Sequence, residues 1–543
     1  MVPYCDRSGA VIEPRPSRQW FCKMAGTEMV DKAIQAAEDG SVNFVPERYK
    51  DIYLRWMGNI RDWPISRQLW WGHRLPVWRK ADSDPNEASS WVCAVTRESA
   101  EEQLGSTDII QSDDVLDTWF SSALWPFATL GWPGNNESLD YYYPTSLLST
   151  AQEILYLWVA RMIMTGEEFI GKKPFDDVYI HATVLDEHGR RMSKTKGNGI
   201  DPVELIDLYG ADALRFSLLR EAGQRQDIRF KPIRDNRQDQ VEQARNFANK
   251  IWNASRFVLM NLPNTLQEPP ITGGQGGNAG TLADRWILSR LSAAVEAVDA
   301  GLSTYNMDDA ARAAYHFFWD DFCDWYIEAA KPTLDTDATR TRALGVLEEA
   351  LKLLHPLLPH LTETIWQALP GKRGFLMNAS FPVAGRRDEA AEARFGMVQE
   401  IVTAIRTLQS THNLKKGGEA FVAPTAEAHL VLEENRSLIE FLTRSTLILD
   451  GTAPEDGFLQ PTRFGDVRLP RQEASAEENA AEKKRIESEL VRLEKDLTGL
   501  NTRLGDPSFA ERAPEAVVNK ARTQQAELTE KKHKLTERLA QLG

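Results

Sequence analysis

The sequence predicts an α/β region that is followed by all-α regions, and three patterns support this fold class. Short apolar runs alternate with helical patterns across residues 66–232, which is typical of parallel α/β construction. Helical periodicity then dominates residues 233–418. Leucine-rich heptads occupy residues 486–504 and indicate a coiled coil.

The chain has 543 residues, too many for one core, because domains average roughly 100–200 residues. The patterns divide it into parts with predicted boundaries at residues 1–65, 66–232, 233–418, 419–473 and 474–543. The fourth part has short strands and helices and forms a small mixed unit. Residues 177–185 (Asp-Val-Tyr-Ile-His-Ala-Thr-Val-Leu) have the pattern of one buried strand.

Composition excludes several protein classes. The 42% apolar and 26% charged content is ordinary for a soluble globular protein. No run of about 18 apolar residues is present, so we predict no membrane partner, and a start without an apolar core favours the cytoplasm. The cysteines are far apart, which argues against a disulfide framework or a cysteine metal site, and we predict no protein-bound metal: Cys5, Cys22, Cys93 and Cys323.

Basic stretches occur on an acidic chain. The formal net charge is −15, but residues 215–256 carry 10 Lys and Arg against 5 Asp and Glu, and residues 481–543 carry 13 against 11. Such stretches are either solvated helix faces or surfaces for nucleic-acid phosphates, and charge alone favours the former.

The heptad spacing predicts a long arm at the C-terminus. Six apolar residues follow a 4-3-4-3-4 spacing: Ile486, Leu490, Leu493, Leu497, Leu500 and Leu504. Gly505-Asp506-Pro507 interrupts the pattern, and a second apolar stripe continues to Leu542. Two helices of about 30 residues, each roughly 45 Å long, would form an antiparallel coiled-coil hairpin.

The chemistry of the chain is concentrated in residues 186–198, Asp-Glu-His-Gly-Arg-Arg-Met-Ser-Lys-Thr-Lys-Gly-Asn, which we call the signature segment. Asp201-Pro202 behind it predicts a helix start. Two ammonium groups and a hydroxyl between a strand and a helix N-terminus suit a polyphosphate, so we predict catalytic roles for Ser193, Lys194 and Lys196. The alternative to a phosphate-binding loop is an ordinary solvated basic loop, which two lysines without the rest of the segment would favour.

The signature segment resembles the KMSKS motif of class I aminoacyl-tRNA synthetases, with Arg191 for the leading lysine and Thr195 for the final serine. The resemblance implies that residues 66–232 are the C-terminal half of a Rossmann-like catalytic domain. It also implies ATP and Mg²⁺ as cofactors, with ATP contacts from Arg191, Met192, Ser193 and Lys194.

A second segment, residues 149–162, resembles the part of this family that meets the adenosine ribose. The resemblance assigns the ribose hydroxyls to Glu153, where many relatives carry Asp, so the reach of this carboxylate departs from the family pattern. It also places Val184 and Leu185 near adenine, with His181 nearby.

Two further segments resemble the valine-specific members of the family. These are residues 65–76, with Trp-Trp-Gly-His, and residues 114–126, with Thr118 and Ser121. The resemblance implies that Trp71 and Trp119 flank the amino-acid side chain, where rigid walls would penalise an extra methylene by about 1–3 kcal/mol. Core packing is the alternative for either indole. An isoleucine–tRNA ligase fragment and a non-catalytic tRNA-binding remnant are the alternative functions.

The C-terminal parts resemble tRNA-binding regions of the same family. Residues 243–253 resemble the first helix of its anticodon-binding bundle, and the coiled coil resembles the tRNA-binding arm of bacterial valine enzymes. The implied partners are valine, ATP and the cognate valine tRNA, and we expect a monomer in the full-length form. Basic residues of the arm suit phosphate contact: Lys483, Lys484, Arg485, Arg492, Lys495, Lys531, Lys532 and Lys534.

One family motif is missing. The family carries His-x-Gly-His on its first strand–helix turn, and none of the nine histidines here belongs to such a motif. Residues 1–65 resemble the exit of the editing insertion. We therefore expect an N-terminally truncated chain that does not form valyl-adenylate alone, for a reason that the sequence does not reveal.

Overall fold

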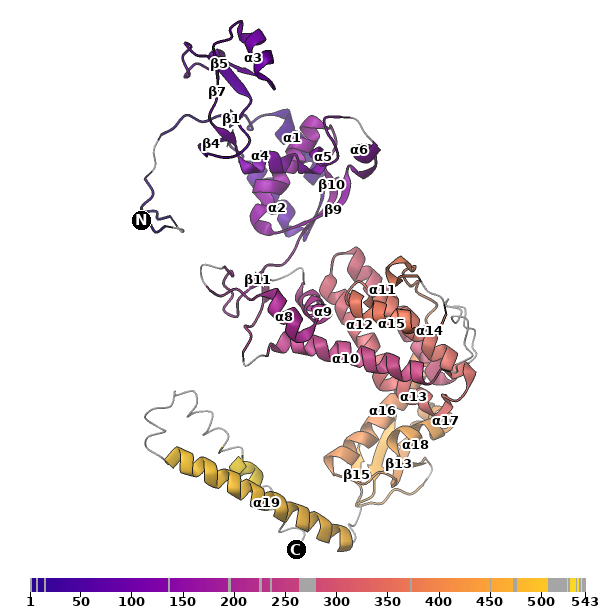
Figure 1. Cartoon of the computed structure of the whole chain (residues 1–543). Coiled ribbons are helices and arrows are strands. Elements are labelled where there is room, and N and C mark those ends of the chain that lie inside the picture. Colours follow the sequence, from indigo (N-terminus) through magenta and orange to yellow (C-terminus); the bar gives the residue numbers. More distant parts are fainter. Residues whose placement is uncertain are drawn as a thin grey trace. The chain divides into compact units, whose positions relative to one another are not determined.

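The structure is a computed structural model whose chain separates into two compact units, Met1–Glu392 and Ala393–Gly543 (Figure 1). Each unit is described by itself. The described residues are 2–5, 8–13, 16–134, 137–193, 197–223, 227–234, 237–262, 280–371, 374–449, 451–471, 476–505, 525, 528–533, 535, 536 and 539. Among them, no helix is both long and apolar enough to cross a membrane.

A parallel sheet forms the α/β layer of the first unit. Its strand order is β2 (Asn43–Val45), β10 (Phe175–Ile180), β9 (Thr145–Thr150). Apolar side chains of the sheet and of neighbouring helices share one core, and the parallel pairing confirms the predicted α/β construction. The helices of this layer are α1 (Glu28–Glu38), α2 (Arg48–Met57), α4 (Thr118–Ala123), α5 (Trp125–Ala128), α6 (Glu137–Tyr142) and α7 (Ala160–Phe169).

The predicted boundary at residue 65 differs from this arrangement. Strand β2 and helices α1 and α2 precede residue 65, yet Phe44 pairs with Val178 across the sheet and both lie in the same core. A boundary at 65 therefore divides one core. The local pattern did not show this because β2 has three residues and its partner lies far away along the chain.

A small antiparallel sheet lies within the range that was predicted to be parallel. Strands β5 (Val77–Lys80), β6 (Trp91–Cys93) and β7 (Ile109–Gln111) pair in the order β6-β5-β7, and α3 (Arg97–Leu104) completes a separate small core with them. Two short antiparallel pairs join this region to the α/β layer: β1 (Phe21–Cys22) with β3 (Trp63–Pro64), and β4 (Ser66–Arg67) with β8 (Val115–Leu116).

The single strand predicted at residues 177–185 is wrong, because two strands occupy this stretch. Strand β10 ends at Ile180, and β11 (Val184–Leu185) pairs in parallel with β12 (Ile228–Arg229) in another sheet. The connecting residues His181, Ala182 and Thr183 include no glycine or proline that would have marked the interruption.

Helices make up the rest of the first unit. Helix α8 begins as predicted, since the Asp201 carboxylate accepts a 2.9 Å hydrogen bond from Val203 N and Pro202 takes the first helical position. A largely π-helical segment, Phe317–Tyr326, buries Phe318 and Phe322 completely. The helices are α8 (Pro202–Tyr209), α9 (Ala211–Glu221), α10 (Asp239–Met260), α11 (Leu282–Ser303), α12 (Met307–His316), α13 (Ile327–Ala330), α14 (Asp337–Leu354) and α15 (Pro359–Ala368).

The second unit begins inside α16 (Glu389–Thr411) and contains a mixed sheet in the order β14 (Thr446–Ile448), β13 (Glu419–Pro424), β16 (Gly465–Leu469), β15 (Phe458–Gln460). Helices α17 (Ala426–Glu434) and α18 (Arg436–Thr443) complete it. Gln409 Nε2 of α16 donates to Thr443 O at 3.1 Å, so α16 packs on this unit. The predicted boundary at residue 418 would have assigned α16 to the helical part.

The arm follows as α19 (Ala476–Gly505), whose residues Ile486, Leu493 and Leu497 are buried. The described residues of its second segment run antiparallel to it. Lys531 pairs with Glu489 at 2.8 Å and Gln525 with Asn501, so partners later in the second segment lie earlier in α19. The described residues of the arm are therefore antiparallel, as the heptads predicted, whereas Asp506 and Pro507 of the predicted turn lie outside the described residues.

Candidate active site

The carboxyl ends of β9 and β10 meet at one edge of the parallel sheet. His181 N, directly after β10, donates to Thr150 O, the last residue of β9, at 3.1 Å. Glu153 lies in the short helical turn that follows β9. Ligands of α/β folds bind at this edge of the sheet. The exposed His181 ring directs Nδ1 to Ala182 O at 3.0 Å.

The signature segment folds back on itself beside this edge. Asp186 N donates to Arg190 O at 2.9 Å, and Leu185 forms a bridge with Arg191. The tight reversal uses Gly189, whose φ is +76°, a value that a side chain disfavours. The guanidinium of Arg191 forms an ion pair with the carboxylate of Glu153. The structure thus brings together two residues that were predicted to contact ATP.

Asn198 connects the two flanks of the predicted lysines. Its Oδ1 accepts from Ser193 N at 3.0 Å, and its Nδ2 donates to Arg191 O at 3.2 Å and to Asp186 Oδ2 at 3.0 Å. Lys194, Thr195 and Lys196 lie outside the described residues. Asn198 was not among the predicted site residues. Its position shortly after the two lysines was the signal in the sequence that could have identified it.

Asp186 is the acceptor at the centre of this arrangement. It is 6% exposed, and its carboxylate accepts hydrogen bonds from His188 N at 3.0 Å, from Arg190 N at 2.8 Å and from Arg190 Nε at 2.8 Å. Burial alone would raise the pKa of this carboxyl, but hydrogen bonds from Asn198, Arg190 and His188 together hold the pKa well below its usual range. Asp186 therefore stays ionised, and it was also missed from sequence.

The predicted adenine contacts lie at the surface. Val184 is 37% exposed, while Leu185 and Met192 are half-buried. An apolar side chain that remains accessible beside the sheet edge suits the flat face of a base.

The two predicted walls of the amino-acid pocket do not form a closed slot. The pairing of β4 with β8 places the segment of Trp71 beside Val115, and a Cβ on Gly72 would lie 3.0 Å from Val115 Cγ2. However, the Trp71 ring is 91% exposed, whereas Trp119 packs against the core of the α/β layer. Only Trp119 is therefore held by its surroundings.

A buried carboxylate beside Trp119 is a feature that sequence reasoning missed. Asp117 is 4% exposed and accepts from Trp63 Nε1 at 2.9 Å, from Arg161 Nη1 at 3.3 Å and from Arg67 Nη2 at 3.1 Å. The Arg161 guanidinium lies 3.8 Å from the Trp63 ring centroid. Burial lowers the pKa of Arg161, although Asp117 opposes this shift. The cluster fixes the start of α4, where Trp119 lies.

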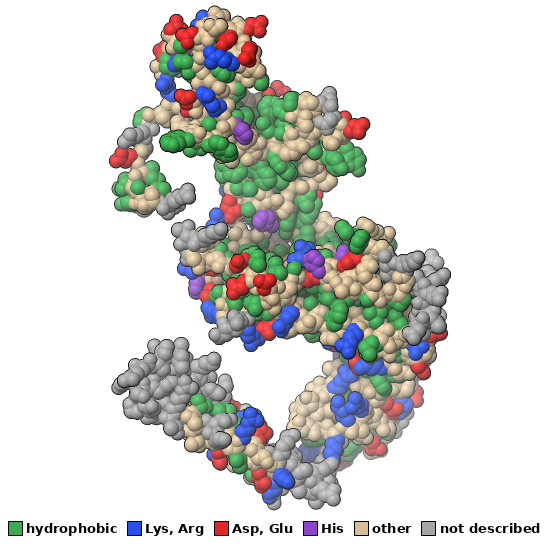
Figure 2. All heavy atoms as spheres, in the orientation of Figure 1, with side chains coloured by type: hydrophobic (Ala, Val, Ile, Leu, Met, Phe, Trp, Pro, Cys, Tyr) green, Lys and Arg blue, Asp and Glu red, His purple; other side chains and the backbone are tan. Residues whose placement is uncertain are grey.

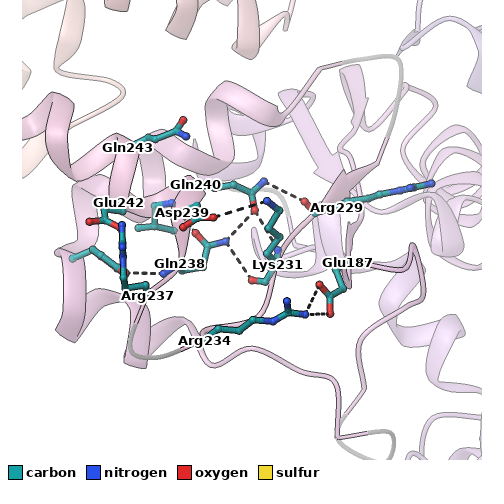
Figure 3. A network of polar contacts seen from close by, with 12 residues as sticks. Glu187, Arg229, Lys231, Arg234, Arg237, Gln238, Asp239, Gln240, Glu242 and Gln243 are labelled. Atoms are coloured by element: carbon teal, nitrogen blue, oxygen red, sulfur yellow. Dashed lines mark hydrogen bonds and ion pairs between the residues drawn. The ribbon is translucent and has the colours of Figure 1, made fainter. Parts of the chain in front are cut away.

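Figure 3 shows polar contacts of the stretch between β12 and α10, among them a pair of Arg234 with Glu187 of the signature segment. Glu187 accepts two hydrogen bonds from Arg234 Nη2, at 2.7 and 2.8 Å. Gln238, which is 1% exposed, caps α10 by accepting from Val241 N at 2.8 Å and donates to Lys231 O at 3.3 Å. Arg234, between β12 and α10, is therefore held by Glu187 of the signature segment, and Lys231 is held by Gln238 at the start of α10.

The predicted tRNA-binding residues of the arm divide into two groups. Lys483, Lys484 and Arg492 are exposed, and Figure 2 shows basic side chains mixed with acidic ones along the arm. Lys531 and Lys532 instead pair with Glu489 and Glu494 across the hairpin, at 2.8 and 2.9 Å. The side chains of Arg485 and Lys495, and the whole of Lys534, lie outside the described structure.

Comparison with known proteins shows which proteins the chain is similar to. Three family models match the chain: tRNA synthetases class I (I, L, M and V) at residues 7–231, the anticodon-binding domain of tRNA ligase at 284–424, and the valyl tRNA synthetase tRNA binding arm at 479–543. The valine–tRNA ligase of Carboxydothermus hydrogenoformans is 42% identical over 562 residues, which cover 100% of this chain. Over its whole length the chain is therefore similar to valine–tRNA ligases.

The valine–tRNA ligase of Thermotoga maritima is also 42% identical over 556 residues. The chain spans 61% of the Carboxydothermus protein and 60% of the Thermotoga protein, so it corresponds to part of these ligases.

A solved structure supports the fold. Mycobacterium tuberculosis methionyl-tRNA synthetase in complex with methionyl-adenylate has a TM-score of 0.50 and 19% identity, and the match covers 67% of this chain and 65% of that one. Together with the family models, this confirms the predicted order of a Rossmann-like catalytic region, an anticodon-binding region and an arm.

Proposed function

We propose that this chain is part of a valine–tRNA ligase, an enzyme that joins valine to its cognate tRNA through valyl-adenylate, with ATP and Mg²⁺. The observation that carries the proposal is the ion pair between Arg191 of the signature segment and Glu153, which lies in the turn after β9 at the carboxyl edge of the parallel sheet. The relatives that share this sequence are named valine–tRNA ligases, which supports valine as the amino acid.

In the proposed reaction, a carboxylate oxygen of valine attacks the α-phosphorus of ATP, and the bond to the leaving pyrophosphate breaks. Ser193, Lys194 and Lys196 stabilise the negative charge that develops on pyrophosphate, while Glu153 accepts the ribose hydroxyls. The 3′-terminal hydroxyl of the tRNA then attacks the carbonyl carbon, and AMP leaves. Val184 and Leu185, with Met192 and His181 nearby, border the base.

The residues present fit an ATP that brings its own magnesium ion. Among the described residues, no group of three or more His, Cys, Asp and Glu side chains could hold a metal. Mg²⁺ commonly binds through substrate phosphates, where it would neutralise charge on the β- and γ-phosphates. In this proposal Arg191 and Lys194 supply the protein's share of positive charge.

For the amino acid, we propose that Trp119 and Trp71 border the side chain of valine. The buried cluster around Asp117 supports a fixed Trp119, since it holds the start of α4. The exposed ring of Trp71 would gain its contacts when substrate or the remaining part of the enzyme covers it.

For the tRNA, we propose that the helices from α10 onward meet the anticodon region and that the arm meets the tRNA backbone through Lys483, Lys484 and Arg492. The matches to an anticodon-binding domain and to a tRNA binding arm support this. We further propose that the full-length enzyme is monomeric and works in the cytoplasm.

Valine-dependent exchange of pyrophosphate into ATP tests the proposal. The chain is assayed alone and together with the part of the Carboxydothermus ligase that it does not cover. We expect no exchange by the chain alone, exchange with both parts, and loss of exchange after Lys194→Ala. A preference for isoleucine would favour an isoleucine ligase, and tRNA binding without any exchange would favour a non-catalytic protein.

A further inference from the structure

One amide side chain, that of Asn198, holds the backbone of the signature segment on both sides of Met192. Asn198 Oδ1 accepts the Ser193 N–H at 3.0 Å, and Asn198 Nδ2 donates to the Arg191 carbonyl at 3.2 Å. The backbone on either side of Met192 is thus bound by the same residue. An amide group has two donor hydrogens and an oxygen that accepts, so Asn198 can bind an N–H and a carbonyl of the segment at the same time.

The other donor hydrogen of Asn198 reaches Asp186 Oδ2 at 3.0 Å. Asp186 follows directly on β11, so the pairing of β11 with β12 fixes where its carboxylate lies. Its remaining lone pairs accept from His188 N and Arg190 N at 3.0 and 2.8 Å. A chain of hydrogen bonds therefore leads from the sheet through Asp186 and Asn198 to the backbone of residues 191–193.

These contacts differ from the ones that build the surrounding fold. Helix α8 has its own cap, because Asp201 accepts from Val203 N at 2.9 Å. The outer side of the signature segment has its own anchor, the pair of Glu187 with Arg234 (Figure 3). Replacing Asn198 by alanine would leave both contacts in place and remove only the side-chain hydrogen bonds to Ser193 N, Arg191 O and Asp186.

We propose that Asn198 and Asp186 are positioning residues, which hold the backbone of residues 191–193 so that the side chains of Arg191 and Ser193 lie where the phosphates bind. This inference rests on the proposed function, in which Arg191 and Ser193 meet the ATP phosphates. A group held in place before the ligand arrives binds it more tightly, because less conformational freedom is lost on binding. Asp186 and Asn198 do not touch the phosphates themselves.

Two measurements on the whole chain test the inference. The first is the dissociation constant for inorganic tripolyphosphate, measured by calorimetry, and the second is hydrogen exchange at the Ser193 amide. Asn198→Ala should weaken tripolyphosphate binding about tenfold and speed exchange at Ser193. Asp201→Ala is the matched control, because it removes a neighbouring hydrogen bond to Val203 N and should change neither value.

A paired replacement separates positioning from general stability. Asn198→Asp alone sets a second carboxylate against Asp186 and should weaken binding. Combining it with Asp186→Asn restores a donor opposite an acceptor and should recover part of the affinity. A variant that merely loosened the fold would not be rescued by a second replacement.

The outcomes distinguish the inference from the function on which it rests. If Arg191→Ala weakens tripolyphosphate binding but Asn198→Ala does not, the inference is wrong and the proposed function stands. If wild type does not bind tripolyphosphate, or binds it equally well after Arg191→Ala, the phosphate role fails and the inference fails with it. Lost binding after Asn198→Ala, with Asp201→Ala unchanged, supports both.

Discussion

The guanidinium of Arg191 forms an ion pair with the carboxylate of Glu153. Arg191 belongs to the signature segment, which follows β11, whereas Glu153 follows β9. Each was predicted to contact a different part of ATP, the phosphates and the ribose. If both residues bind ATP as proposed, the nucleotide replaces this ion pair with contacts of its own.

Removing the charge of Glu153 should affect the binding of ATP and of tripolyphosphate differently. Glu153→Gln should weaken ATP binding about tenfold, because a charged acceptor for the ribose hydroxyls is lost. The same change should leave tripolyphosphate binding equal or stronger, because Arg191 loses its competing partner. Calorimetric titration of both ligands checks this, and equal weakening for ATP and tripolyphosphate would contradict the assignment of Glu153 to the ribose.

The buried cluster around Asp117 predicts a large loss of stability. Asp117→Ala would leave Arg161, whose side chain is 11% exposed, without its carboxylate, and removing one partner of a buried pair costs about 3–5 kcal/mol. Asp113→Ala is the control, because this 99% exposed partner of Arg74 should contribute at most about 1 kcal/mol. Urea unfolding followed by tryptophan fluorescence measures both, and similar losses would argue against the cluster.

We expect the hydroxyl of Tyr305 to ionise only in strongly alkaline solution. Its hydroxyl donates to Asp177 Oδ2 at 2.8 Å, and its ring stacks on Tyr179 with centroids 5.4 Å apart. Desolvation, together with Asp177, raises the pKa of Tyr305 to about 12. Because the folded-state pKa is raised, the contact stabilises fully below about pH 10 and is lost as pH rises toward 12.

Ultraviolet titration of tyrosinate absorbance measures this ionisation. The difference between wild type and Tyr305→Phe should have its midpoint near pH 12 instead of about 10. Asp177→Asn should move the midpoint downward, because the negative acceptor is gone. A wild-type midpoint at 10 would exclude the contact.

Replacing different lysines of the arm by alanine should change tRNA binding by different amounts, although all of them carry the same charge. Exposed Lys483 and Lys484 are free to meet phosphate, so each change to Ala should reduce the slope of log binding constant against log salt for valine tRNA by about 1. Lys531, which pairs with Glu489 at 2.8 Å, should change the slope less. Filter binding over a salt series decides this, and equal slopes for all three variants would refute the distinction.

Some features follow from residues that are close together in the chain. The heptads predicted α19 and its buried Ile486 and Leu493, because an apolar seam depends only on spacing. Asp201-Pro202 predicted the start of α8 for the same reason, since a helix cap is a local contact. The chemistry of the signature segment was likewise predicted from the order of its residue types.

Other features depend on partners that local patterns do not specify. Three residues of β2 joined a strand far along the chain, and the stretch 177–185 divided between two sheets. Asp117 was visible as an acid among apolar residues, but its partners Arg67 and Arg161 come from two other segments. Such side chains come into contact only when distant segments pack together. Their contacts therefore produce no periodic pattern in the sequence.

The sequence by itself therefore determined the similarity to valine–tRNA ligases, the order of the regions and the residue types of the signature segment. Tertiary structure alone decided which of those residues touch: Arg191 with Glu153, and Asn198 with Asp186. It also decided that Trp119 is held while Trp71 stands exposed. Spacing determines which face of an element a side chain occupies, but packing between distant segments determines what that side chain meets.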